Sequence, residues 1–216
     1  MNQPFPPMPG RIAKLPRDHR GFPIPWFVAV QPDGTRDFRV ADGHKNELAV
    51  RNKLCWVCGE HLGRFLSFVI GPMCVVNRCT AEPPCHLDCA EFSATACPFL
   101  IRPRMRRNEN DLPDGHTVPP GQFITRNPGV ACVYTTLSYR RFDAMGSGKL
   151  IKLGEPTSVR WFAESKPASR EEVMASIDSG YPLLLDMARK DGAEAIEELE
   201  FLMERAMSLL PPEEAA

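Results

Sequence analysis

The sequence predicts an α+β fold, in which a small antiparallel sheet contains an embedded cysteine-rich lobe and is followed by a helical C-terminal segment. Three observations support this prediction. Short segments rich in β-branched and aromatic residues follow one another through the middle of the chain. Seven of the eight cysteines lie within residues 54–100, here called the cysteine-rich lobe. From Ser169 onward, apolar residues recur at spacings of three and four, which is typical of helices.

The composition narrows the class of protein. The chain has 216 residues, of which 43% are hydrophobic and 25% charged, as in soluble globular proteins with one main core. It contains no apolar run of about 18 residues, and its first residues lack the basic and then apolar pattern of a signal peptide. We therefore expect a cytoplasmic protein without a membrane segment. In that reducing compartment, clustered cysteines are more often metal ligands or reactive thiols than disulfides.

Three regions are expected: a proline-rich arm at 1–25, an α+β core at 26–163 and an acidic helical segment at 164–216. The arm holds seven prolines, which restrict φ and remove backbone donors, so it should be extended. The core opens with "WFVAVQPDGTRDFRV" (26–40), where alternating apolar residues flank a Pro-Asp-Gly turn, as in a β-hairpin. A short helix is expected over 45–51, just before the first cysteine.

The cysteine-rich lobe predicts a zinc site. Structural zinc takes four nitrogen or sulfur ligands in a tetrahedron. The motif "CWVCG" supplies Cys55 and Cys58 from a tight knuckle, whose glycine permits the chain to reverse. Two prolines precede the helix-compatible "CHLDCAEFSATAC", so His86 and Cys89 fall three residues apart on one helical face. We predict that these four residues bind one structural Zn²⁺.

A second arrangement would use two zinc ions, the first bound by Cys55, Cys58, Cys74 and Cys79 and the second by Cys85, His86, Cys89 and Cys97. Against it, cysteine often serves as a small buried hydrophobe, and Cys132 in the apolar "VACVY" is expected to do so. A catalytic zinc usually keeps one position open for water. Three cysteines and one histidine fill all four positions, and the deaminase and His-Glu-x-x-His patterns are absent, so we expect a structural role.

Two resemblances follow from these motifs. Cys55-x-x-Cys58, the β-like "FLSFVI" and His86-x-x-Cys89 at a helix start resemble a treble-clef zinc finger over roughly 40 residues. The longer series "PIPWFV", "CWVCG", "GPM", "EPP" with its His and Cys, and "CPFL" resembles a set of uncharacterised proteins from bacteria and tailed bacteriophages. The first resemblance implies a treble-clef-like zinc lobe. The second implies no activity and favours a bacterial or phage cytoplasm.

The strands of the core are expected after a loop-like stretch, "NENDLPDGHTVPPGQ" (108–122), which is rich in Pro, Gly, Asn and Asp. Three β-favouring segments follow it, near 130–139, 149–153 and 158–163. Because they are short and sequential, we expect them to pair in antiparallel fashion.

The C-terminal region begins with Ser169-Arg170-Glu171-Glu172, which matches a helix capping box. Gly180-Tyr181-Pro182 and Asp191-Gly192 would divide the rest into three helical pieces. The last piece carries an apolar stripe, which we expect to pack on the protein itself. Residues 164–216 hold 13 acidic and 5 basic side chains, so the outer faces of these helices should be acidic.

A nucleic acid is the first specific partner that the sequence suggests. Four arginines follow the lobe in "RPRMRR": Arg102, Arg104, Arg106 and Arg107. Arginine suits phosphate contacts, and Lys53, Arg64 and Arg78 would extend the same basic face. Nearby aromatic residues would stack on bases: Trp56, Phe65, Phe68 and Phe99. We therefore predict binding of DNA or RNA at this face.

Two other functions stay open. One is an enzyme whose cleft lies between the sheet and the lobe. It would use scattered polar residues: Arg39, Asp42, Lys45, Asn77, Arg78 and His116. These residues do not form a recognisable pattern of nucleophile, base and orienting group. The other is a phage or bacterial adaptor or inhibitor, whose acidic helices bind another protein. Nucleic-acid binding would weaken steeply with salt, an enzyme would have a deep pocket with perturbed titratable groups, and an adaptor would have neither.

Overall fold

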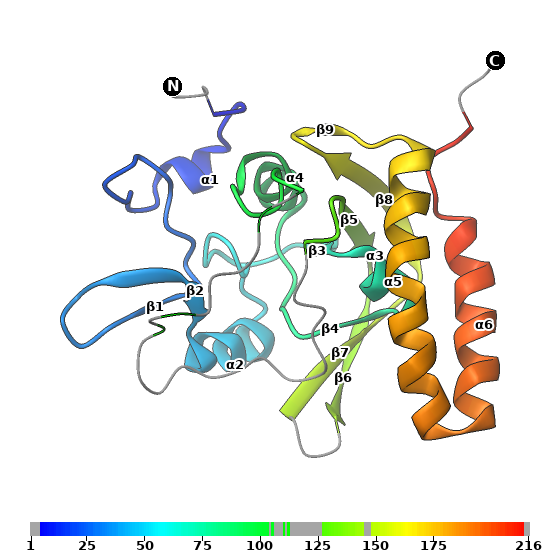
Figure 1. The fold of residues 1–216 in the computed structure, drawn as a ribbon. Coiled ribbons are helices and arrows are strands. Elements are labelled where there is room, and N and C mark those ends of the chain that lie inside the picture. Colours follow the sequence, from blue (N-terminus) through cyan, green and yellow to red (C-terminus); the bar gives the residue numbers. More distant parts are fainter. Residues whose placement is uncertain are drawn as a thin grey trace.

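The computed structural model describes residues 5–103, 105, 110, 112, 127–144 and 148–213. Within these residues the chain forms several short helices, small antiparallel sheets and a C-terminal pair of longer helices (Figure 1). The fold is therefore α+β, as the sequence predicted. Apart from 110 and 112, the loop-like stretch 108–122 lies outside the described residues.

The N-terminal part holds a short helix, a hairpin and a second helix: α1 (Gly10–Ala13), β1 (Val28–Val30), β2 (Arg36–Ala41) and α2 (Gly43–Asn52). The predicted hairpin is confirmed, since β1 and β2 pair antiparallel. The predicted helix over 45–51 lies within α2, which begins where the Asp42 carboxylate accepts hydrogen bonds from the amides of His44 and Lys45. The arm is not extended throughout, because α1 forms and buries Ile12 against the cysteine-rich lobe.

The central sheet consists of β3 (Leu66–Ile70), β5 (Ala131–Thr136), β8 (Pro156–Ala163) and β9 (Lys166–Pro167), in the order β3-β5-β8-β9. All three pairings are antiparallel. β5 lies in the middle and is buried along its whole length. Its successive side chains point to opposite faces. Val133 packs with α4 (Leu87–Ala96) on one face, and Tyr134 packs with α5 (Arg170–Asp191) on the other, so the sheet separates two apolar cores.

A second sheet has the order β4-β7-β6, formed by β4 (Cys79–Thr80), β7 (Gly148–Leu153) and β6 (Tyr139–Ala144). The segment near 130–139, predicted as one strand, is divided between β5 and β6. At this division the Thr136 hydroxyl donates a 2.7 Å hydrogen bond to the Glu155 carbonyl, and the Gly154 amide donates a 2.9 Å bond to the Ser138 carbonyl. The chain thus leaves the central sheet after Thr136 and pairs with β7. Antiparallel pairing is confirmed, but it is distributed over three small sheets.

The C-terminal region forms two helices, α5 and α6 (Ala193–Met207), rather than the three predicted pieces. The capping box is confirmed, because Ser169 and Glu172 each accept a hydrogen bond from the other's amide, at 3.2 and 2.8 Å. The chain turns at Gly192, but α5 continues through Pro182. Gly180 marks a close approach instead of a break, since a β-carbon there would lie 2.9 Å from the Met73 sulfur.

The apolar stripe of α6 packs on the protein itself, as expected. Leu199 and Ala206 of α6 form an apolar cluster with Leu184 and Ala188 of α5 and with Val76 of α3 (Pro72–Asn77). The two helices lie side by side in Figure 1, at the side of the molecule away from the N-terminal hairpin. No helix in the described part of the chain is both long and apolar enough to cross a membrane.

Candidate metal centre

The first half of the site is a knuckle between α2 and β3. An isolated bridge between Leu54 and His61 closes it, and within it the Cys55 amide donates to the Glu60 carbonyl at 2.7 Å. Gly59 adopts a φ of 78°, which glycine tolerates far better than other residues. The Cys58 amide points at the Cys55 sulfur, at 3.4 Å. This turn holds both thiols on one side of the knuckle.

The second half of the site lies at the start of α4. His86 is the N-cap residue of this helix, and Cys89 follows in its first turn. The preceding residue, Cys85, forms an isolated bridge with Ser67 of β3, with backbone hydrogen bonds of 2.7 and 3.0 Å. The Trp56 amide donates to the Pro84 carbonyl at 3.0 Å and so joins the knuckle to this segment. One backbone hydrogen bond thus joins the knuckle to the segment that carries the other two side chains.

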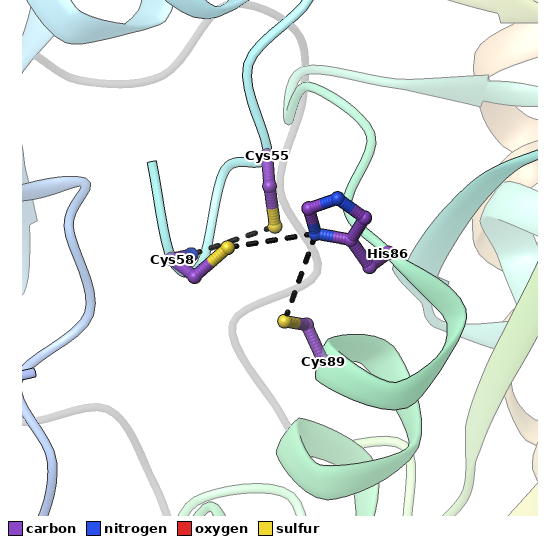
Figure 2. A group of neighbouring side chains, drawn as sticks. All are labelled: Cys55, Cys58, His86 and Cys89. Carbon is purple, nitrogen blue, oxygen red and sulfur yellow. Dashed lines mark hydrogen bonds between the residues drawn. The ribbon is translucent and has the colours of Figure 1, made fainter. Parts of the chain in front are cut away.

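The four predicted ligand side chains converge. The three sulfurs and one imidazole nitrogen all lie within 4.8 Å of one another, and Figure 2 shows the side chains pointing to a common centre. His86 Nδ1 is 3.5 Å from the Cys58 sulfur and 4.0 Å from the Cys89 sulfur. A zinc ion with bonds of about 2.0–2.3 Å would place tetrahedral ligands about 3.5–3.8 Å apart. The observed spacing fits a metal ion of that size.

The other imidazole nitrogen has its own partner. His86 Nε2 lies 2.9 Å from the carbonyl oxygen of His61. A carbonyl only accepts, so Nε2 carries the proton and Nδ1 presents a lone pair to the thiols. Metal-binding histidines are commonly oriented by a second partner in this way. The sequence could not indicate this partner, because the acceptor is a backbone atom.

Three thiols at this distance cannot all ionise easily without a cation. The pKa of Cys55 is lowered, mainly by hydrogen bonds from Cys58 and then Cys89 to its thiolate. The hydrogen bond to Cys55 raises the pKa of Cys58 to about 11. The pKa of Cys89 is also raised, first by its hydrogen bond to Cys55 and then by that to Cys58. A bound cation would remove this conflict by stabilising all three thiolates together.

The structure does not assemble the alternative pair of four-ligand sites. Within the described ranges, Cys55, Cys58, His86 and Cys89 are the one set of three or more potential ligands close enough to hold a metal. Cys74 lies in α3 and packs against the core on the other face of the central sheet. Cys79 belongs to β4, and Cys97 caps the far end of α4.

The two remaining cysteines are accounted for without a metal. Cys85 is buried, and its thiol donates to the Ser67 carbonyl at 3.2 Å. Cys132 is fully buried in β5, as expected for a small hydrophobe. The sulfur cluster of the sequence thus divides into one ligand set and several packing residues.

The predicted nucleic-acid face is described only in part. Arg102 is exposed, whereas Arg104, Arg106 and Arg107 lie outside the described residues. Two of the four aromatic residues are unsuitable for stacking on bases, because Trp56 and Phe68 are buried in the protein. Phe65 is 56% exposed. Arg78 does not extend a free basic face, since its side chain is largely enclosed and binds Glu155.

The polar residues proposed for an enzyme cleft have structural roles where they are described. Asp42 caps α2, and Lys45 donates to the Val28 carbonyl at 2.9 Å. Asn77 accepts a hydrogen bond from the Cys79 amide at 2.9 Å. His116 lies outside the described residues.

The four side chains could hold a metal ion. Three thiolates and one imidazole favour soft or borderline ions such as Zn²⁺ over Mg²⁺ or Ca²⁺. Cys55 and Cys89 have no exposed surface, so a bound ion would be shielded from solvent on that side. In comparisons with protein-family models, curated proteins and solved structures, none matches this chain. The interpretation of the site therefore rests on its own geometry.

Proposed function

We propose that this protein binds one structural Zn²⁺ through Cys55, Cys58, His86 and Cys89. The observation that carries the proposal is the convergence of four donor atoms, all within 4.8 Å, from two chain segments separated by more than a β-strand and a helix. The four residues complete a tetrahedral coordination shell. No position is left for a water or a substrate, so the metal supplies stability and not catalysis.

The proposed role of the ion is to connect the N-terminal knuckle to α4. Backbone contacts between these segments are sparse: one hydrogen bond joins Trp56 to Pro84, and one side-chain contact joins His86 to the His61 carbonyl. Structural zinc commonly contributes a large part of the folding free energy of a small lobe, about 10–16 kcal/mol in isolated zinc-finger peptides at neutral pH. Here the ion would hold the knuckle, and with it the hairpin β1–β2, against the central sheet.

Elemental analysis of protein purified without added metal tests the site, together with a thiol count before and after denaturation. We expect about one zinc per chain and an increase in reactive thiols when the protein unfolds. The double variant Cys55→Ser, Cys89→Ser should lose the metal, and the control Cys132→Ser should retain it. Full zinc content in the double variant would overturn the ligand assignment, and two zincs per chain would require further ligands.

We further propose that the protein binds DNA or RNA beside the cysteine-rich lobe. This proposal is supported by the exposure of Arg102 just after α4 and by the excess of basic residues in 51–107, which hold eight basic and four acidic side chains. Fluorescence anisotropy with a labelled single-stranded oligonucleotide should give an affinity that falls with salt, by a log–log slope of about −0.7 for each phosphate contact.

The matched variant for this measurement replaces Arg102, Arg104, Arg106 and Arg107 together by Gln. It should reduce both the affinity and the salt slope while zinc content and unfolding temperature stay unchanged. If affinity and slope equal those of the wild type, these arginines do not form the interface.

A further inference from the structure

A small cavity lies on the far side of the central sheet from the metal ligands. It is enclosed by the end of α3, the turn between β7 and β8 and the last turns of α6, and its volume is about 80 Å³. Its polar wall contains Arg78, Tyr134, Glu155 and Arg205. One water requires about 10–15 Å³ of such space. The cavity therefore has room for several waters or for one tetrahedral oxyanion.

Two guanidinium groups meet one carboxylate in this wall. Arg78 Nη1 donates to Glu155 Oε1 at 2.8 Å, and Arg205 Nη2 donates to both Glu155 oxygens at 2.9 Å. Among these three charged groups one positive charge is in excess. The Arg78 side chain is only 13% exposed, so its charge is poorly screened by solvent. The excess charge of this group of three favours an additional anion.

Arg78 also has a donor without an acceptor. Its Nε is buried and has no hydrogen-bond partner among the described residues, while its Nη2 donates to the Leu153 carbonyl at 3.2 Å. The Arg78 guanidinium also interacts with the side chain of Tyr134, which lines the same cavity. Arg141 Nε and Trp56 Nε1 are unpartnered as well, but neither residue lines this cavity.

The backbone holds Arg78 in place. Its φ of 56° is a left-handed conformation that residues other than glycine rarely adopt. The Leu153 amide donates to the Arg78 carbonyl at 2.8 Å, so main chain and side chain of Arg78 both bind Leu153 of β7. Strained conformations of this kind persist where the surroundings hold them, and they are common at ligand sites. The donor is thus presented from a fixed position.

We propose that this cavity binds a phosphate group, either as the free ion or as the terminal group of a phosphomonoester. Arg78 and Arg205 are its ligands, since the planar guanidinium matches phosphate oxygens. Glu155 binds both guanidiniums in the free protein and repels the incoming anion. The site uses none of the metal ligands, so it stands or fails independently of the zinc proposal.

Isothermal titration of the full chain with inorganic phosphate tests this site, with ionic strength held constant by chloride. The wild type should bind one phosphate per chain in a saturable manner. Arg205→Gln should weaken binding about tenfold or more, because a charge-assisted hydrogen bond is lost. Glu155→Gln should tighten it, because a repulsive charge is removed. Arg205 lies at the end of α6 and is partly exposed, so its replacement leaves the fold intact.

The matched control is Arg141→Gln, which removes an arginine with the same pairing to a glutamate, Glu47, and the same unpartnered Nε, away from the cavity. It should leave phosphate affinity unchanged within about twofold. A parallel titration with glycerol 3-phosphate identifies the source: tighter binding indicates a phosphomonoester, and binding of inorganic phosphate alone indicates the free ion. Absence of saturable binding below about 50 mM, or equal affinity in Arg205→Gln, would overturn the proposal.

Discussion

The indole ring of Trp26 lies directly over the α-carbon of Gly59. A β-carbon at Gly59 would lie 2.8 Å from Cγ and Cδ1 of that ring, closer than real β-carbons approach other atoms. Trp26 also meets Trp56 edge to face, at 6.4 Å between ring centroids. The residue that turns the metal knuckle is therefore also the residue on which the N-terminal hairpin packs, so the two parts of the protein should respond together to changes at either one.

Gly59→Ala should destabilise the protein more than Gly34→Ala does. Both glycines have φ near 80°, but nothing lies within 4 Å of a β-carbon at Gly34. In both variants, alanine in a left-handed backbone conformation costs about 1–2 kcal/mol of unfolding free energy. At Gly59, displacement of the Trp26 ring adds about 1–3 kcal/mol. Denaturant unfolding of both variants measures the difference. Equal losses would show that the ring moves aside without cost.

Removal of the metal with a chelator should shift the tryptophan emission to longer wavelength. Trp56 lies between the two knuckle cysteines, is 4% exposed and stacks on Phe27 at 5.0 Å. If the knuckle loosens without the ion, this indole becomes solvated. In Trp56→Phe the shift should be smaller, and what remains should come from Trp26, which packs on Gly59. Trp161 is anchored elsewhere by its hydrogen bond to the Leu209 carbonyl and should not contribute. An unchanged spectrum after complete metal removal would show that packing alone holds the knuckle.

The ion pair between Glu47 of α2 and Arg141 of β6 should contribute stability only above acidic pH. The side-chain hydrogen bonds of Arg141 lower the pKa of Glu47 below its ordinary 4.5. A lowered folded-state pKa gives stability that is complete above the unfolded value and is lost as the pH falls through the folded value. The gap in unfolding temperature between the wild type and Glu47→Gln should therefore be constant above about pH 5 and shrink below 4.5.

The predicted ligands Cys55, Cys58, His86 and Cys89 also respond to acid, but they are the same in the wild type and in Glu47→Gln. The difference between the two unfolding temperatures therefore reports on Glu47 alone. Because Glu47 is largely exposed, the gap should be small, on the order of 1 °C or a few degrees. A gap that widens as the pH falls below 4.5 would contradict the assigned role of the pair.

Pro182→Ala should stabilise α5. Pro182 lies inside this 22-residue helix, is exposed and cannot donate the hydrogen bond that its helical position would otherwise make to Asp178. Alanine restores the donor and has the highest helix propensity, so we expect a gain of about 1–3 kcal/mol in unfolding free energy. Thermal unfolding followed by circular dichroism is the measurement. A loss of stability would show that the proline ring is needed where α5 meets its surroundings.

The sequence by itself was sufficient for features that depend on local spacing. The Cys55-x-x-Cys58 knuckle and the His86-x-x-Cys89 turn each place two ligands by short-range geometry, and the Ser169 capping box depends on residues three apart. Alternation of apolar residues likewise identified the hairpin, and β-favouring residues located β5 within a longer predicted segment. For the same reason the four-ligand set could be named, although its closure depended on contacts across the fold.

Only the tertiary structure decided which cysteines stay outside the site and where strands and helices end. Cys74 was a possible ligand beside Cys58 in the sequence, yet the central sheet places the two on opposite faces. Pro182 does not end α5, because packing on both sides of it outweighs one missing hydrogen bond. Arg78, Glu155 and Arg205 are distant in sequence and meet only through the pairing of β7 with β4 and the docking of α6. Long-range contacts of this kind leave no local pattern in the sequence.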